Sequence, residues 1–183
     1  MTEGDTSATA QYTDAARARL VMAYEACVLA DLARAAVPIG EDELSPDGTT
    51  RTPGAVLADA ARVLAAAQRY FEAAAVFELI GGADWQLIGD VLHVPARTAR
   101  VRFAMAEAAF RKEVLHPEET GSAEAPDEAG GLRAYMAREP LEVALDLDDW
   151  VLRHEDGDSQ LGTAPVSGGL TRKDPRRSAE KHS

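Results

Sequence analysis

Cysteine, aromatic residues and long apolar runs are all scarce in this sequence. Its single cysteine, Cys27, excludes an intrachain disulfide and any metal site built from several cysteines. Aromatic residues make up only 5%, whereas the apolar 46% is rich in alanine, the best helix former. No apolar run reaches 18 residues, and the polar, acidic start of the chain lacks the apolar centre of a signal peptide. We therefore expect a cytoplasmic, all-α protein with no membrane span and no cofactor.

The net charge of −12 is distributed unevenly. Residues 118–158 hold thirteen acidic residues and three arginines, whereas residues 95–112 carry a net charge of +4. An acidic total argues against a nucleic-acid partner, but salt limits the range of charges to about 8–10 Å. The basic segment therefore remains a candidate for binding a polyanion. A second hypothesis is autoinhibition, in which residues 118–158 fold back onto this segment.

Two long helices are predicted in the first half of the chain. The first has Thr13 as its N-cap and ends before Pro38. The second has Thr52 as its N-cap and Pro53 at its first helical position, and it runs to about Ile80. We expect the two to pair as an αα-hairpin, alone or in a dimer, with their apolar stripes as core or dimer seam. The stripes are Leu20, Tyr24, Cys27, Val28 and Leu32, then Leu57, Ala61, Leu64, Gln68, Phe71, Ala75 and Leu79.

Changes in composition divide the rest of the chain. A stretch rich in Pro, Gly and acids predicts a linker, and a short apolar pattern with Trp150 predicts a helix that docks onto the body or onto a partner. The expected organisation is a disordered leader at 1–12, a helical domain at 13–116, a linker at 117–131, a short helical segment at 132–156 and a disordered, basic-ended tail at 157–183.

The segment Asp84–Phe103 predicts two short helices joined by a tight turn. The first helix ends at about Leu92, the chain turns at His93 and Val94, and the second helix starts at about Ala96. This is the layout of a helix-turn-helix, whose second helix lies in the major groove of DNA.

These residues resemble the helix-turn-helix of a group of small actinobacterial DNA-binding proteins, related in style to region 4 of sigma factors. The group's motif has Trp, two variable residues and Ile-Gly, then a Leu-Gly-Val-Ser-Arg turn and a closing Arg-Phe. The segment 147–154 also resembles one that follows this motif in the same group. Of the motif, this chain keeps Trp85, Ile88, Gly89, Asp90, Leu92, Val94, Ala99, Arg102 and Phe103.

Three positions depart from that motif. His93 stands in place of the turn glycine, which usually holds a positive φ. Pro95 stands in place of the serine that caps the second helix and contacts phosphate, and Ala96 in place of an arginine. The resemblance thus implies fewer contacts to DNA than in the group itself.

The resemblance implies that the outer side of the second helix meets DNA. Arg97 and Arg100 share a helical face, and each can contact guanine or phosphate. Arg102 is a further candidate, although it can also reach a neighbouring acid or the backbone. The full set of expected DNA-binding residues is Gln86, Arg97, Thr98, Arg100, Val101 and Arg102.

The leading interpretation is a helix-turn-helix transcriptional regulator. A homodimer is expected because one such helix reads few base pairs and half-sites are usually paired. The alternative is an acidic protein-interaction module, in which the helix at 141–154 binds RNA polymerase, a sigma factor or another regulator. Phosphate-binding loops, nucleophile elbows and zinc-protease motifs are missing from the sequence, so we do not expect an enzyme.

Overall fold

The computed structural model of the protein describes residues 12–37, 40–115, 135–155 and 160–171. The predicted all-α class is confirmed, because all the named elements of the described residues are helices and extended pairing is confined to isolated bridges such as that between Leu44 and Thr50. None of the described helices is long and apolar enough to cross a membrane. In chain order the elements are α1 (Asp14–Ala35), the 3₁₀ turn η1 (Glu41–Glu43), α2 (Ala55–Ile80), α3 (Trp85–Leu92), α4 (Ala96–Phe110), the π-helical turn η2 (Arg111–Leu115), α6 (Pro140–His154) and the 3₁₀ turn η4 (Ser167–Gly169).

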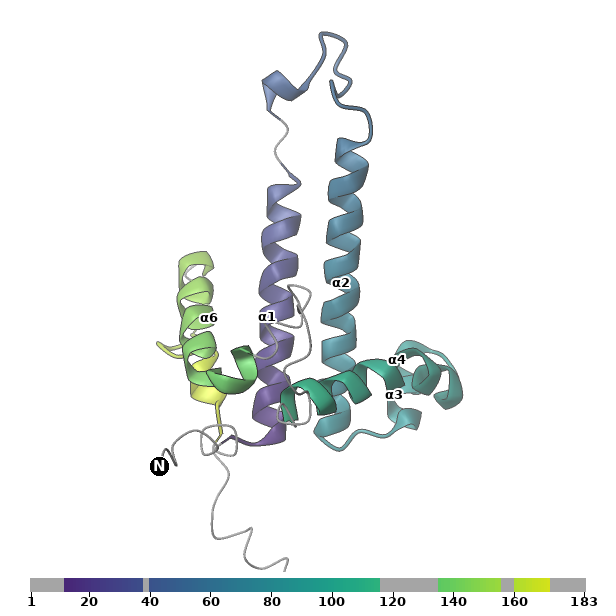
Figure 1. Cartoon of the computed structure of the whole chain (residues 1–183), viewed down its shortest axis with the longest axis vertical. Helices are drawn as coiled ribbons and strands as arrows, with labels where there is room; N and C mark the ends of the chain where they lie inside the picture. The colour runs from purple at the N-terminus through teal and green to yellow at the C-terminus, as the bar shows by residue number, and fades with distance from the viewer. Residues whose placement is uncertain (1–11, 38–39, 116–134, 156–159, 172–183) are drawn as a thin grey trace, which may run out of the picture.

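Helices α1 and α2 form the long hairpin that the sequence predicts (Figure 1). Thr13 caps α1, since its hydroxyl oxygen accepts a hydrogen bond from the Ala16 N–H at 3.2 Å. A polar contact also joins the two helices, because Nε of Arg69 donates to the buried carboxylate of Glu25 at 3.1 Å. A buried charge without a partner is costly, so this pair fixes how the helices face one another.

The start of α2 differs from the prediction. Gly54 precedes the helix with φ at 91°, a left-handed backbone that glycine adopts without steric cost. The carbonyl of Thr52 accepts a hydrogen bond from the Ala55 N–H at 3.2 Å, so Thr52 and Pro53 lie in the preceding turn. Thr52 is therefore not the N-cap, because the chain enters the helix through the glycine. At the other end Gly82, with φ at 105°, terminates the helix as expected.

Helices α3 and α4 pack on the C-terminal half of α2 through a small apolar core. Ala75 from α2 lies buried against Ile88 from α3 and against Ala99 and Phe103 from α4. The Phe71 ring meets the Phe103 ring edge-on, with centroids 5.2 Å apart, which is a favoured aromatic geometry. The helix-turn-helix is thus fixed to the hairpin and is not a separate unit.

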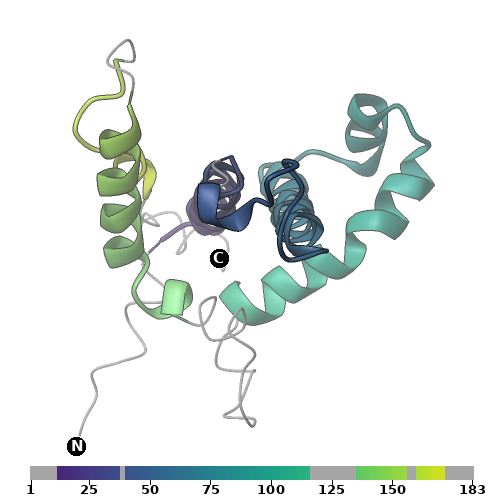
Figure 2. The same cartoon turned by 90° about the horizontal axis from the view of Figure 1, so that it is seen from above.

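A larger core lies at the other side of the hairpin and includes α6. Figure 2 shows α6 on the opposite side of the hairpin from α3 and α4. This position does not support autoinhibition through α6, since the helix packs on α1; residues 118–134 of the acidic region lie outside the described residues. The buried members of the core are Ala18, Leu20, Val21, Val76, Phe110, Val114, Met136, Val143, Ala144, Leu147 and Val166.

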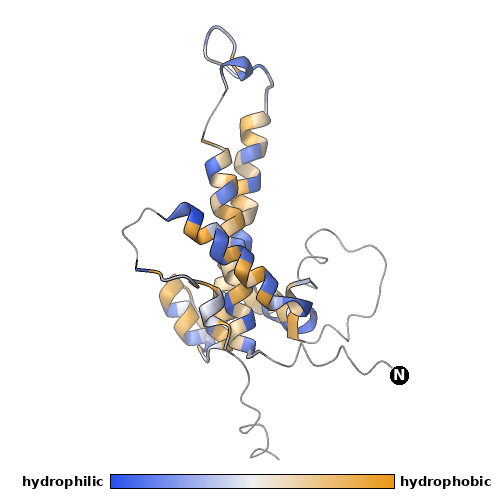
Figure 3. Cartoon of the chain, turned by 90° about the vertical axis from the view of Figure 1, so that its left-hand side faces the viewer, coloured by the Kyte–Doolittle hydropathy of each residue, from blue (hydrophilic) through white to orange (hydrophobic). Residues whose placement is uncertain are grey.

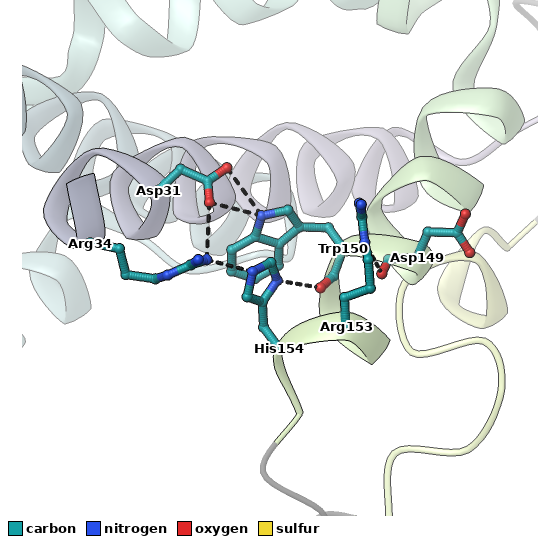
Figure 4. A network of polar contacts seen from close by, with 6 residues as sticks. All are labelled: Asp31, Arg34, Asp149, Trp150, Arg153 and His154. Carbon is teal, nitrogen blue, oxygen red and sulfur yellow. Dashed lines mark hydrogen bonds and ion pairs between the residues drawn. The ribbon is translucent and has the colours of Figure 1, made fainter.

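Trp150 docks α6 onto the body of the protein. Its ring N–H donates to both carboxylate oxygens of Asp31 on α1, each at 3.1 Å (Figure 4). Asp31 also pairs with Arg34 at 3.4 Å, and Arg34 contacts Nε2 of His154.

Burial, with a smaller contribution from Asp31, raises the pKa of the neighbouring Cys27 thiol to about 11. The thiol therefore stays protonated and packs as an apolar group.

Residues 160–171, which the sequence analysis placed in the tail, pack against α1 and α6. Asp148 on α6 is buried and accepts hydrogen bonds from the backbone N–H of Val166 at 2.6 Å and of Ser167 at 3.1 Å. Arg19 on α1 donates to the carbonyl of Pro165 at 3.0 Å. The packing of residues 160–171 depends on contacts between distant parts of the chain, and the composition of the segment does not reveal such contacts. Of the other predicted regions, the linker at 117–131 and nearly all of the leader at 1–12 lie outside the described residues.

Candidate nucleic-acid interface

The turn between α3 and α4 has the geometry that the sequence predicts. Asp84 caps α3, because its carboxylate accepts the Leu87 N–H at 2.8 Å. His93 ends the helix in the left-handed region, with φ at 56° and ψ at 40°. A residue with a Cβ adopts this conformation at a cost, and histidine replaces the motif's glycine here. Val94 and Pro95 then lead into α4, whose N-terminus has no side-chain cap.

Gly89 lets α3 and α4 approach one another closely. A Cβ at this position would lie 2.6 Å from the carbonyl oxygen of Val94 and 3.1 Å from the nitrogen of Ala96. Both are backbone atoms and cannot rotate away. The N–H of Val94 also donates to the Gly89 carbonyl at 2.9 Å, which closes the turn. The absence of a side chain at residue 89 therefore sets the angle at which α4 leaves the turn.

Four of the expected DNA-binding residues lie exposed at or beside the outer face of α4. Ala99 and Phe103 point into the core, so the opposite side of the helix faces solvent. Val101 is at the middle of this outer face and is 75% exposed. Arg97 and Thr98 in the first turn, and Arg100, lie at or beside it. Within the described residues, neither Arg97 nor Arg100 forms an ion pair.

The other two expected residues lie apart from this face. The Arg102 guanidinium stacks on the Phe71 ring at 4.7 Å, and also lies 5.4 Å from the Phe103 ring. It faces α2, at the flank of α4. Gln86 on α3 donates its amide N–H to the Asp90 carboxylate at 2.8 Å. Both side chains are exposed, but each has an intramolecular contact that DNA would have to replace or share.

The electrostatics of α4 favour an anion at its N-terminal end. Its first turn holds no acidic residue, and the helix dipole places partial positive charge there. Arg97 adds a full charge at the same end. The acidic residue of the helix, Glu107, lies near the C-terminal end and pairs with Arg111 at 2.9 Å. The positive end of α4 therefore coincides with the exposed arginines.

Sequence reasoning missed Met105, which is 79% exposed on the same outer face of α4. It follows Val101 by one helical turn, so the periodicity that placed Val101 could have found it. The outer face therefore combines cationic and apolar side chains. Apolar side chains on a reading helix can meet thymine methyl groups, and they can equally contact another protein.

An apolar groove of about 270 Å³ lies between α2 and α3. Phe71, Ala74, Leu87 and Val91 are among its lining residues. Among the described residues no group of His, Cys, Asp or Glu is arranged to hold a metal ion. The site thus offers surface charge and shape for a macromolecule.

No protein-family model matches this chain, and no curated protein or solved structure matches it.

Proposed function

We propose that the protein binds double-stranded DNA with the outer face of α4 and acts as a transcriptional regulator. The observation that carries this proposal is the exposed face around Val101, where Arg97 and Arg100 project from the start of a helix held by a helix-turn-helix turn. This combination of shape and charge fits the major groove.

Each element has a distinct role in the proposed complex. The first turn of α4 lies deepest in the groove, where Arg97 and Thr98 reach base edges or phosphates. Arg100 contacts the neighbouring phosphates or a guanine. Val101 and Met105 exclude water beside thymine methyl groups. The packing of Phe103 against α2 holds α4 at a fixed orientation during binding.

The test is capture of fragmented genomic DNA from the source organism, followed by sequencing, with the intact protein and with Arg97→Ala/Arg100→Ala. We expect enriched fragments that share a motif and are lost in the variant. The control is Arg62→Ala/Arg138→Ala, which removes the same charge from exposed sites outside α4. If the control loses as much binding as the α4 variant, only net charge matters and the proposed reading face is wrong.

Salt dependence provides a second measurement. Each phosphate contact releases counterions, so affinity falls by about 0.9 log units per contact for each log unit of salt. Removing a phosphate-contacting arginine lowers this slope by about one, whereas removing a base-contacting arginine relaxes sequence preference. Arg97→Ala and Arg100→Ala, measured singly, therefore assign the two roles.

A specific observation favours one alternative, a protein-interaction module that uses α6. Leu141, Leu145 and Leu152 are 40–51% exposed along one edge of this helix, beside the face that packs in the core. Glu142 and Asp149 lie beside these leucines and are exposed. A row of leucines flanked by acids fits a groove that is apolar with a basic rim, as on RNA polymerase, a sigma factor or another regulator.

The α6 alternative predicts that affinity for a partner protein changes little with salt and is lost in Leu145→Ser. The same affinity should be unchanged in Arg97→Ala/Arg100→Ala. The DNA proposal predicts the opposite pattern for the same two variants.

A further inference from the structure

The N-terminal half of α2 presents an apolar face that nothing in the described structure covers. Leu57 and Leu64 on this face are 74% and 70% exposed. Further along the same stripe, Phe71 and Ala75 are covered by α3 and α4. The stripe is thus half covered and half bare, and Figure 3 shows apolar residues continuing along the upper hairpin. The sequence analysis left open whether this stripe is core or dimer seam.

Large and small side chains alternate along the bare half. Leu57 and Leu64 are seven residues apart, and Ala60 and Ala67 follow each leucine by three. This is the heptad spacing of a helix–helix seam, with one bulky and one small position in each repeat. The hairpin partner α1 packs on the other side of α2, where Ala66 is fully buried. The seam is therefore additional to the contact with α1.

Charge argues against a nucleic acid or a charged peptide on this face. The charged side chains of this half, Asp59 and Arg62, lie on the side of α2 away from the leucines and pair with each other. The seam itself carries alanine and leucine. Its partner must therefore be an apolar helical surface.

The chain's own remaining segments cannot supply such a surface. Residues 1–11, 38–39, 116–134, 156–159 and 172–183 contain only three large apolar side chains. These are Met1, Ile39 and Leu132, each from a different segment. One such side chain does not make an amphipathic face, so the occupant comes from another molecule.

We propose that the bare half of α2 pairs with the same half of α2 in a second copy of the chain, in antiparallel orientation. In this register Leu57 lies against the partner's Ala67, and Leu64 against the partner's Ala60. Each bulky residue then meets a small one, so the two backbones approach closely and the face is its own complement. A parallel register would place leucine against leucine and alanine against alanine.

The size of the seam sets the strength of the dimer. Residues 57–67 extend about 15 Å along the helix axis, so the contact is smaller than a standard permanent interface. The dimer is therefore weak and depends on protein concentration.

The pairing is tested by sedimentation equilibrium of the full chain without DNA. We expect a monomer–dimer equilibrium in which Leu64→Glu raises the dissociation constant by more than about 100-fold, because two leucines leave the seam and two charges enter it. The matched control is Met105→Glu, an equally exposed residue on α4 that is expected to keep the wild-type constant. A chain that stays monomeric at every concentration, or equal constants for the two variants, overturns the proposal.

Orientation is tested by disulfide trapping in a Cys27→Ser background. Antiparallel pairing predicts that a Leu57→Cys chain cross-links to a differently tagged Ala67→Cys chain and not to itself. Self-cross-linking of Leu57→Cys would show a parallel pair and contradict the register. Because both measurements omit DNA, their failure leaves the DNA-binding proposal intact, and failure of DNA binding leaves the dimer intact.

Discussion

The hairpin carries two modules on opposite sides, and they are held in different ways. The helix-turn-helix of α3 and α4 is held by an apolar core and by the close backbone approach at Gly89. The C-terminal module of α6 and residues 160–171 also has an apolar core, but two carboxylates, Asp148 and Asp31, hold its outer parts. Apolar packing does not titrate, whereas carboxylate contacts do. The two modules should therefore respond differently to the same change of conditions.

The protein contains a natural probe for each module. Trp85 lies at the edge of the α3–α4 core, and Trp150 lies on α6 against α1. In a Trp150→Phe background the fluorescence reports on the helix-turn-helix alone, and in Trp85→Phe on the C-terminal module.

The largest effect is expected from Gly89→Ala. The added Cβ meets two backbone atoms, so α3 and α4 must move apart, at a cost of about 3 kcal/mol in the free energy of unfolding. Urea unfolding followed through Trp85 measures this loss. The comparison variant is Gly169→Ala in the other module, where the Cβ meets the end of the Arg19 side chain. That side chain can swing away with loss of its hydrogen bonds, at about 1 kcal/mol. Equal losses would contradict the distinction between the modules.

Asp148→Asn should weaken the C-terminal module by about 2 kcal/mol, because a buried charged acceptor loses strength toward residues 166 and 167. Burial opposes the ionised form, but hydrogen bonds from Ser167 and Val166 outweigh it, and the pKa of Asp148 is lowered. A lowered pKa means that the carboxylate stabilises the fold above its unfolded value of about 3.9, and that this contribution is lost as the pH falls through the folded value.

Acid titration of the two single-tryptophan proteins checks the pH dependence of Asp148. The C-terminal module should loosen before the helix-turn-helix as the pH falls below about 4. In Asp148→Asn the difference between the two titrations should shrink. Simultaneous transitions in the two single-tryptophan proteins that keep Asp148 would show that Asp148 does not control the order.

His93→Gly should stabilise the helix-turn-helix by about 1 kcal/mol. The left-handed backbone at this residue costs a histidine more than a glycine, and the side chain is exposed. Thermal unfolding followed through Trp85 measures the gain, and the C-terminal module should be unaffected. A loss of stability would mean that the imidazole makes a contact worth more than the strain.

Arg102→Ala should have the smallest effect, about 0.5 kcal/mol, because stacking of an exposed cation on Phe71 is weak. Its effect on DNA affinity should also be smaller than that of Arg97→Ala, since Arg102 lies at the flank of α4. A larger loss of DNA affinity for Arg102→Ala would move the reading face toward α2.

Local signals in the sequence predicted the hairpin and the helix-turn-helix well. Thr13 caps α1 as its position suggested, and His93, which stands in place of the motif's turn glycine, takes the left-handed conformation. The prediction that Thr52 caps α2 was wrong, because the chain enters the helix through Gly54. A threonine followed by proline gives the same local signal whether the helix begins there or after a further turn. The exposed arginines of α4 followed from periodicity, but the stacking of Arg102 on Phe71 joins residues 31 apart and has no local signal.

The C-terminal module shows where sequence reasoning stops. Residues 160–171 are rich in Gly, Ser and Pro, yet Val166 is buried and Asp148 holds its backbone N–H. A truncation at residue 117 therefore removes part of the main core along with the acidic region. Charge reversal at the exposed Glu142 and Asp146 on α6 tests the effect of acidity on DNA binding without that loss.

Helix α4 rests on two supports. At its middle, Phe103 packs in the core shared with α2 and α3; at its end Phe110, followed by Val114 in η2, enters the core that contains α6. Because α4 is packed into a core at two separate points, it resists both tilting and sliding along its axis. In the proposed complex α4 would therefore meet DNA as a rigid body, and any force that turns the helix would be transmitted along its length to the far side of the hairpin.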